Sequence, residues 1–137
     1  MKAFYTLLIL LIPFVGFGQQ TLDISEKIYE KVEIMPRFDD CKSQKCSDKK
    51  INEFISKNTV YPKKAKNRLA SGTAYIIFVV DKKGYVVNVE LLKSSGNKHL
   101  DKEALRVINS LPKFKPGLNF GKKVNVKQII PVKFTFV

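Results

Sequence analysis

"VNVKQIIPVKFTFV", residues 124–137, decides the fold, because apolar residues alternate with other residues along most of its length. Such alternation is typical of a strand with one face on a core and one face in water. The predicted inner face consists of Val124, Val126, Ile130, Val132, Phe134 and Phe136, and the outer face of Asn125, Lys127, Lys133 and Thr135. Pro131 has no N–H to donate, which predicts an edge strand or an outward-facing position for the missing donor.

Two further strands are predicted upstream, in "TAYIIFVV" (73–80) and "YVVNVELLKS" (85–94). The first is apolar on both faces, as in a central strand. "DKKG" (81–84) joins the two as a short turn, because Gly84 adopts positive φ readily. In the second strand Tyr85, Val87, Val89 and Leu91 should share one face, opposite Asn88 and Glu90. The sequence therefore predicts a hairpin.

"HLDKEALRVINSL" (99–111) predicts an amphipathic helix. Its apolar stripe consists of Leu100, Ala104, Val107, Ile108 and Leu111. Asn97 is the predicted N-cap, and Asp101 and Glu103 lie early, where the helix dipole favours acids. Pro112 should end the helix, Phe114 should pack beneath its end, and "KPG" (115–117) should turn the chain back into the sheet.

The segments before the hairpin are less regular. "SDKKINEFISKN" (47–58) predicts a helix capped by Ser47, with Asn58 at its exit and Ile51, Phe54 and Ile55 on one face. "YPKKAKNRLASG" (61–72) predicts a short basic helix with Pro62 in its first turn and Gly72 as its stop. Residues 21–38 predict a weak strand or an extended arm, and a helix is not excluded.

This order of elements predicts an α+β fold with a three-stranded antiparallel-type sheet and a β-β-α-β core. The first predicted strand should be central, giving the order 2-1-3, and the last strand should reach its other side through a right-handed crossover. One or two N-terminal helices should pack on one face. We expect a signal peptide at 1–18, an arm at 19–46 and the folded domain at 47–137.

The first residues predict export. Met1 and Lys2 precede the apolar run 3–15, and the small residues Gly16 and Gly18 then precede Gln19, as in a secretory signal peptide. Cleavage is expected after Gly18, and an uncleaved membrane anchor is the alternative. Cys41 and Cys46 would meet oxidising conditions, so a disulfide is expected between them, with free thiols or a metal site as alternatives. No metal site or cofactor is predicted.

The formal net charge of +13 is unevenly distributed. Residues 41–70 hold nine Lys and Arg against two acids, and residues 104–137 hold seven against none. Such a surface attracts anions, although it is also compatible with a merely solvated basic face. No nucleic-acid motif is present. Catalysis is not expected, because His99 is the only histidine and no serine lies in a nucleophile motif.

From Val60 to Val137 the chain resembles the C-terminal domain of TonB, the periplasmic energy transducer of Gram-negative bacteria. The resemblance rests on an ordered set of motifs rather than on any single one. These are Tyr61-Pro62, Ala65, Gly72, the Asp81 to Gly84 turn, Leu100-Asp101, Glu103-Ala104, Pro112, Pro116-Gly117, Gly121-Lys122, Pro131-Val132 and Phe134. "VEIMPRF" (32–38) also resembles the lead-in of many such proteins.

The resemblance implies a periplasmic protein that takes part in transmembrane transport. Such a domain binds the TonB box, a short N-terminal peptide of outer-membrane TonB-dependent transporters, as a strand added to its last strand. The predicted partner-binding residues are Val124, Asn125, Val126, Lys127 and Ile129, together with Asn58 and Tyr61. If the missing donor of Pro131 faces outward, odd-numbered residues present their N–H groups to the guest.

Several expectations accompany this resemblance. Lys127, Lys133 and Pro131 would alternatively protect the edge against pairing. An anion-binding envelope protein and an edge-to-edge homodimer are the competing functions. Phe114 stands where the family commonly has tryptophan, and the proline-rich linker of the transducers is not seen between the predicted signal and Tyr61. We therefore expect a binding module without coupling to the inner membrane.

Overall fold

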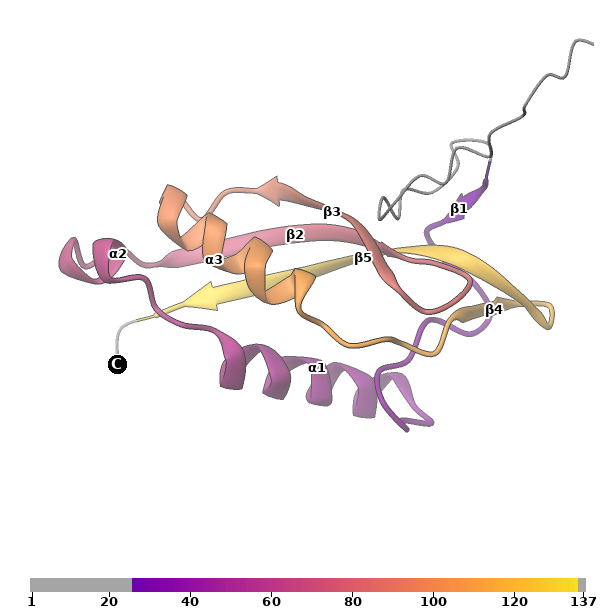
Figure 1. Cartoon of the computed structure of the whole chain (residues 1–137). Helices are drawn as coiled ribbons and strands as arrows, with labels where there is room; N and C mark the ends of the chain where they lie inside the picture. The colour runs from indigo at the N-terminus through magenta and orange to yellow at the C-terminus, as the bar shows by residue number, and fades with distance from the viewer. Residues whose placement is uncertain (1–25, 136–137) are drawn as a thin grey trace, which may run out of the picture.

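The computed structural model describes residues 26–135 (Figure 1). The elements are β1 (Ile28–Tyr29), α1 (Gln44–Asn58), α2 (Lys63–Asn67), β2 (Gly72–Val80), β3 (Val86–Lys93), α3 (Lys98–Asn109), β4 (Gly117–Asn119) and β5 (Lys122–Phe134). The predicted signal peptide and Phe136 lie outside the described residues. No helix between residues 26 and 135 has the length and apolar character needed to cross a membrane.

The sheet confirms the predicted order of the three main strands, since β2 lies between β3 and β5 and is antiparallel to both. The β2–β5 register runs without a break from Gly72 opposite Phe134 to Val80 opposite Val126. β4 was not predicted, and β1 is a two-residue strand in the arm, where a weak strand was one of the expected alternatives. β1 pairs in parallel with β5, and β4 pairs in antiparallel fashion with the first residues of β5.

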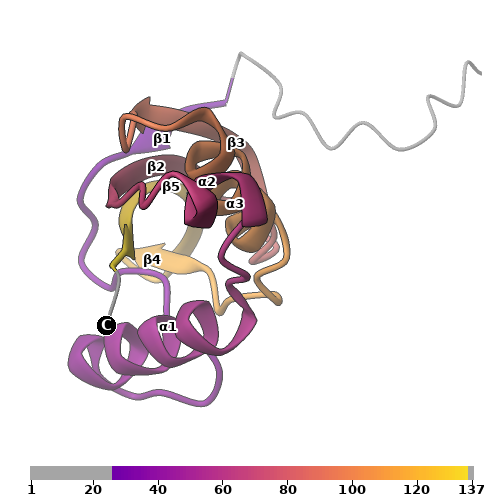
Figure 2. The same cartoon turned by 90° about the vertical axis from the view of Figure 1, so that its left-hand side faces the viewer.

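The core lies between the inner face of this curled sheet and the helices (Figures 1 and 2). All five predicted stripe residues of α3 are buried, and Asn97 caps the helix by accepting from the N–H groups of His99 and Leu100. The inner face of β5 is also confirmed by the burial of Val126, Ile130, Val132 and Phe134. Full burial of each large apolar side chain stabilises the fold by about 1.5–3 kcal/mol.

Phe114 is buried, as predicted, and it links segments that lie far apart in the sequence. Its ring makes edge-to-face contacts with Phe38 at 5.2 Å and with Phe78 of β2 at 6.3 Å, between ring centroids. Phe38 also contacts Phe54 of α1 at 6.1 Å. This aromatic cluster joins the arm, α1 and the loop after α3 to the centre of the sheet.

The start of α1 differs from the prediction. The N-cap is Ser43, whose Oγ accepts from the N–H of Cys46, so the helix begins at Gln44 and not after Ser47. Ser47 is buried inside the first turns, where its Oγ accepts from the N–H of Phe38 at 2.7 Å. Cys41 and Cys46 form the predicted disulfide across this turn, with their Cα atoms 5.5 Å apart.

Gly72 does not stop α2 as predicted. The helix is only five residues long, Pro62 is its N-cap, and Leu69 leaves it with φ of 53°. Gly72 instead begins β2, where a Cβ would lie 2.3 Å from the carbonyl oxygen of Ser95. The position therefore requires glycine because two backbones approach closely there.

The predicted alternation in β3 is also wrong in part. Asn88 has φ of 52°, and the register shifts between Val87 opposite Val79 and Glu90 opposite Ile77. Val87 and Glu90 therefore share a face, because an irregularity of this kind changes which residues face the core. The sequence carries no glycine at this point to reveal it.

The loop after α3 is positioned by close backbone contacts. Pro112 is exposed and lies three residues beyond the last residue of α3, while Pro116 leads into β4. A Cβ at Gly117 would lie 2.6 Å from Cγ2 of Val126. Gly84 has φ of 90°, and its carbonyl accepts from the N–H of Phe114 at 2.7 Å. A Cβ there would lie 1.9 Å from the carbonyl oxygen of Phe114.

Replacing Gly84 with alanine should destabilise the domain by about 3 kcal/mol or more, because positive φ and a backbone collision add together. Gly96 is the matched control, since its φ is 95° and a Cβ there would meet nothing within 4 Å. Gly96→Ala should cost only about 1 kcal/mol. Urea unfolding of both variants measures the difference, and equal losses would show that the contact with Phe114 is unimportant.

Candidate functional site

β5 has two hydrogen-bonding edges that are filled to different extents. β2 covers one edge from Val126 to Phe134. On the opposite edge β1 pairs only with Asn125 and Val126. Within residues 26–135, no other strand pairs with β5 from Lys127 to Phe134 on that side. We call this stretch the open edge.

The open edge is shorter than the predicted binding site. Asn125 lies opposite Ile28 and is 1% exposed, and Val126 lies opposite Tyr29 and is fully buried. Val124 lies opposite Gly117 of β4. The guest register predicted from the sequence includes Val124, Asn125 and Val126, and in the structure β1 and β4 pair with these residues. Lys127 and Ile129 remain on the open edge.

The amide of Asn125 fixes the arm to the sheet. Its Oδ1 accepts from the N–H of Lys82 at 3.0 Å, and its Nδ2 donates to Oε2 of Glu26 at 2.9 Å. The other oxygen of Glu26 lies 3.0 Å from Nζ of Lys82. A weaker ion pair joins Glu30 and Lys127 at 3.9 Å, and both side chains are exposed enough for water to screen it. These contacts supplement a strand pairing of only two residues.

Pro131 indicates which backbone groups face the open edge. It lies opposite Tyr75, inside the unbroken β2–β5 register. A proline is tolerated in a paired strand where its missing donor points away from the partner strand. Since successive residues direct their N–H groups to alternate sides, the odd-numbered N–H groups of Lys127, Ile129 and Lys133 face the open edge.

α1 lies on the β5 side of the sheet (Figure 2). Residues of α1 and of β5 line the two walls of a groove. The groove has a volume of about 540 Å³, and it lies beside the C-terminal half of the open edge. Its lining consists of Asn52, Ile55, Ser56, Thr59, Tyr61, Pro131, Lys133, Phe134 and Thr135.

The two predicted site residues that precede α2 differ in their placement. The ring of Tyr61 lines the groove, contacts Phe134 edge-on at 5.8 Å, and its hydroxyl donates to the carbonyl of Ala70. Asn58 does not line the groove. Its amide donates to the carbonyl of Phe54 at 2.8 Å, and its own carbonyl accepts from Nη2 of Arg106 at 2.8 Å. Asn58 therefore joins α1 to α3.

A second hollow, of about 290 Å³, lies where the arm leaves β5. It is lined by Glu30 and Met35 of the arm and by Lys127, Gln128 and Ile129 of β5. The amide nitrogen of Gln128 is buried and has no hydrogen-bond partner among the described residues. Sequence reasoning missed this residue, although an amide among the apolar inner-face positions of β5 was a signal that could have identified it.

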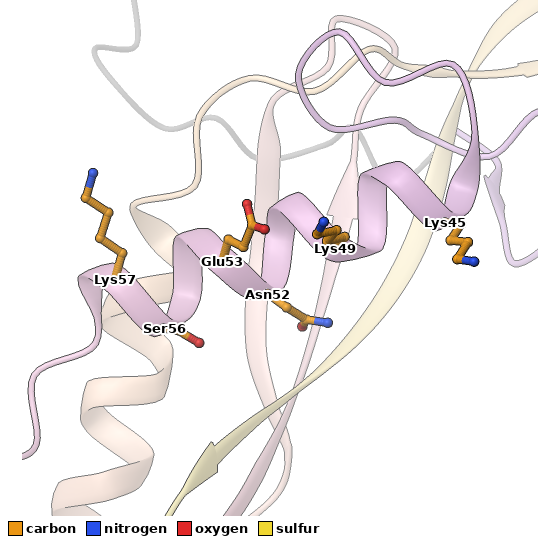
Figure 3. Close-up of a pocket in the computed structure, with 6 residues that line it drawn as sticks. All are labelled: Lys45, Lys49, Asn52, Glu53, Ser56 and Lys57. Atoms are coloured by element: carbon orange, nitrogen blue, oxygen red, sulfur yellow. The ribbon is translucent and has the colours of Figure 1, made fainter.

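Basic residues gather at two further places. Lys83, Lys113, Lys115 and Lys123 surround a hollow whose rim also carries Asp39 and Asp40. None of these four lysines forms an ion pair with a described residue within 4 Å. On α1, a shallow hollow is lined by Lys45, Lys49, Asn52, Glu53, Ser56 and Lys57, and Figure 3 shows that all six project from this one helix.

The acidic residues considered for catalysis accept hydrogen bonds that stabilise local structure. Asp101 accepts from the N–H and Oγ of Ser95, and Asp81 accepts from the N–H groups of Lys83 and Tyr85 in the hairpin turn. Partial desolvation and the neighbouring Lys98 lower the pKa of His99. Among residues 26–135, no group of three or more His, Cys, Asp and Glu side chains is placed to hold a metal ion.

Comparison with known proteins agrees with this fold. The family described as "Gram-negative bacterial TonB protein C-terminal" matches residues 57–136. The chain is 30% identical over 78 residues to "Protein TonB" of Haemophilus ducreyi, a match that covers 57% of this chain and 26% of that protein. It therefore spans about a quarter of that relative's length.

Two solved structures of the Helicobacter pylori TonB C-terminal domain are also similar. One, of residues 179–285, has a TM-score of 0.56 and 24% identity, covering 70% of this chain and 86% of that one. The other, of residues 194–285, has a TM-score of 0.50 and 27% identity, covering 64% and 90% respectively.

The curled sheet, with helices on one face and a partly open last strand, defines a small α+β domain. The match over more than half of its residues identifies it further: the chain belongs to the family of Gram-negative bacterial TonB protein C-terminal domains. The resemblance stated from the sequence is confirmed.

Replacing Asn125 with leucine should loosen the arm, because it removes the acceptor of the Lys82 N–H and the donor to Glu26. We expect a loss of stability of about 1–2 kcal/mol, since a partly buried backbone donor loses its partner and the amide contact with Glu26 is also removed. Faster amide hydrogen exchange at Ile28 and Tyr29 should accompany it.

Lys127→Ala is the matched control, because it removes only the exposed ion pair with Glu30. Its effect on stability should stay below about 0.5 kcal/mol. Equal exchange at Ile28 and Tyr29 in Asn125→Leu and in the native chain would contradict the role given to Asn125.

Proposed function

We propose that the open edge of β5 receives an extended peptide from an outer-membrane TonB-dependent transporter as an added strand. The observation that carries this proposal is the stretch from Lys127 to Phe134, which pairs with β2 on one edge and with no strand of residues 26–135 on the other. Main-chain hydrogen bonds would supply affinity, and side-chain hollows along the edge would supply selectivity.

The two hollows support the same proposal. Both the groove against α1 and the hollow beside the arm are lined by residues of the open edge. Side chains of an added strand would alternate between the two sides of the sheet, so some of them would lie beside each hollow. A guest that spans Ile129 to Lys133 would therefore meet a separate space at each end.

The arm limits the guest register on one side. Because β1 pairs with Asn125 and Val126, an added strand lies beyond them, along Lys127 to Phe134. We infer that the protein acts in the periplasm, in TonB-dependent transport. This placement is supported by the predicted signal peptide and by the family.

Two competing functions can be distinguished from strand addition by experiment. Binding of anions at the hollow of Lys83, Lys113, Lys115 and Lys123 is favoured by the lack of ion pairs there, and it would weaken steeply with salt. Pairing of two open edges would give a homodimer, and its fraction would rise with protein concentration. Strand addition should survive moderate salt, because uncharged backbone groups supply much of the affinity.

Replacing Ile129 with proline should weaken binding of a synthetic transporter box peptide at least about tenfold, because it removes an outward N–H. Stability should fall by only about 1 kcal/mol, since that N–H takes no part in the β2–β5 ladder. Isothermal titration and urea unfolding provide the two measurements.

Ile129→Val is the control, because it keeps the N–H while shortening the side chain. Ile129 is 52% exposed, so binding should change by no more than about twofold and stability by less than about 0.5 kcal/mol. If the proline variant binds the peptide as well as the native chain, strand addition along odd-numbered N–H groups is wrong.

A further inference from the structure

The hollow beside the arm contains a polar group that the fold leaves without a partner. Nε2 of Gln128 is buried and unpaired, whereas buried amides in folded proteins nearly always find a partner. Gln128 lies opposite Phe78, on the face that otherwise carries apolar residues. A leucine at this position would pack without leaving a donor unsatisfied, so the amide has no evident role in the fold itself.

An added strand would bring a side chain next to this amide. Residues directly opposite each other on adjacent strands share a face, with Cβ atoms about 4.5–5.5 Å apart. The guest residue opposite Gln128 would therefore project into the hollow that Gln128 lines. The terminal torsion of glutamine is broad, so a rotation about it presents Nε2 to that side chain.

The surrounding charges indicate which side chain fits. Lys127 lines the same hollow, and its ion pair with Glu30 is long, at 3.9 Å. The side chain of Glu30 is 81% exposed, so a guest carboxylate can replace it beside Lys127 at little loss. Lys127 and Gln128 leave β5 on opposite faces, but both line this hollow at the edge of the strand. A carboxylate in the hollow would accept from the amide of Gln128 and from the ammonium of the long Lys127 side chain, and charge-assisted hydrogen bonds are the stronger kind.

We propose that Gln128 is a specificity-determining residue, and that the hollow of Glu30, Met35, Lys127, Gln128 and Ile129 selects an aspartate or glutamate in the guest strand. This proposal rests on the strand addition proposed above, and it names the chemistry of the partner at one position. The arm then serves as one wall of the binding site, through Glu30 and Met35.

The experiment uses an uncharged host peptide of alternating threonine and valine, in which a single glutamate is moved along the sequence. Affinity of the folded chain for each peptide is measured by titration. At one position of the host peptide, the peptide with glutamate should bind about tenfold more tightly than the peptides with the isosteric glutamine or with leucine. Equal affinity for all the glutamate-containing peptides, whatever the position of the glutamate, would overturn the proposal.

Two substitutions at Gln128 test the residue directly. Gln128→Leu should bind the host peptide as the native chain does, while its preference for glutamate at the selected position falls to about twofold or less. Gln128→Glu should reverse the preference in favour of lysine at that position. Unfolding curves of both variants confirm that each is folded before its affinity is interpreted.

A matched pair of lysines separates a specific contact from general attraction by a basic protein. Lys127→Gln should reduce the glutamate preference by about threefold or more, whereas substitution of the exposed Lys102 of α3, Lys102→Gln, should leave it within about twofold. Equal reductions would show that net charge alone is responsible, and the assigned hollow would be wrong.

The outcomes distinguish this inference from the proposed function. If every peptide binds without preference at one position, strand addition stands and the selective hollow is overturned. If no peptide binds, and none protects the amides of the open edge, both are overturned.

Discussion

Backbone hydrogen bonding along β5 is the constraint on which the rest of the structure depends. The strand is thirteen residues long, and β2, its main neighbour, has nine. β1 and β4 add two and three residues at its N-terminal end. β1, β2 and β4 each pair with a different part of β5, and this division positions the core, α1 and the arm. What they leave unpaired is the open edge.

An unpaired edge normally invites aggregation, and natural sheets protect such edges with charges, prolines or covering segments. Here Pro131, Lys127 and Lys133 lie on the edge, and α1 stands beside it without pairing to it. These features restrict pairing of β5 with the edge strand of another sheet. They leave the groove between β5 and α1, where the proposed peptide would lie. Protection and binding are therefore compatible, because a peptide between β5 and α1 needs less room than another folded edge.

The main architecture was predictable because its signals are strong and local. The alternation along most of β5 and the stripe of α3 each extend over many residues, so burial of one face leaves little choice, and the turn at Gly84 marks the hairpin. Pro131 and Phe114 were likewise informative, since each has a property that few environments satisfy. The family resemblance added the expectation that the last strand binds a peptide.

The remaining features were not predictable from local patterns. β1 is two residues long, and its pairing depends on the contacts of Asn125 with Glu26 and Lys82, which lie far from it in the sequence. The irregularity at Asn88 exchanges faces without a glycine to mark it. The sequence marks Gln128 as an amide among apolar positions of β5, but only the surrounding atoms show that its amide nitrogen has no partner.

Amide hydrogen exchange with and without a transporter box peptide tests the central claim most directly. The N–H groups of Gln128, Ile130 and Val132 point to β2 and should exchange slowly in both states. Those of Ile129 and Lys133 should exchange quickly in the free chain and slow by about tenfold or more when the peptide binds. Unchanged exchange at Ile129 and Lys133 under saturating peptide would contradict strand addition to β5.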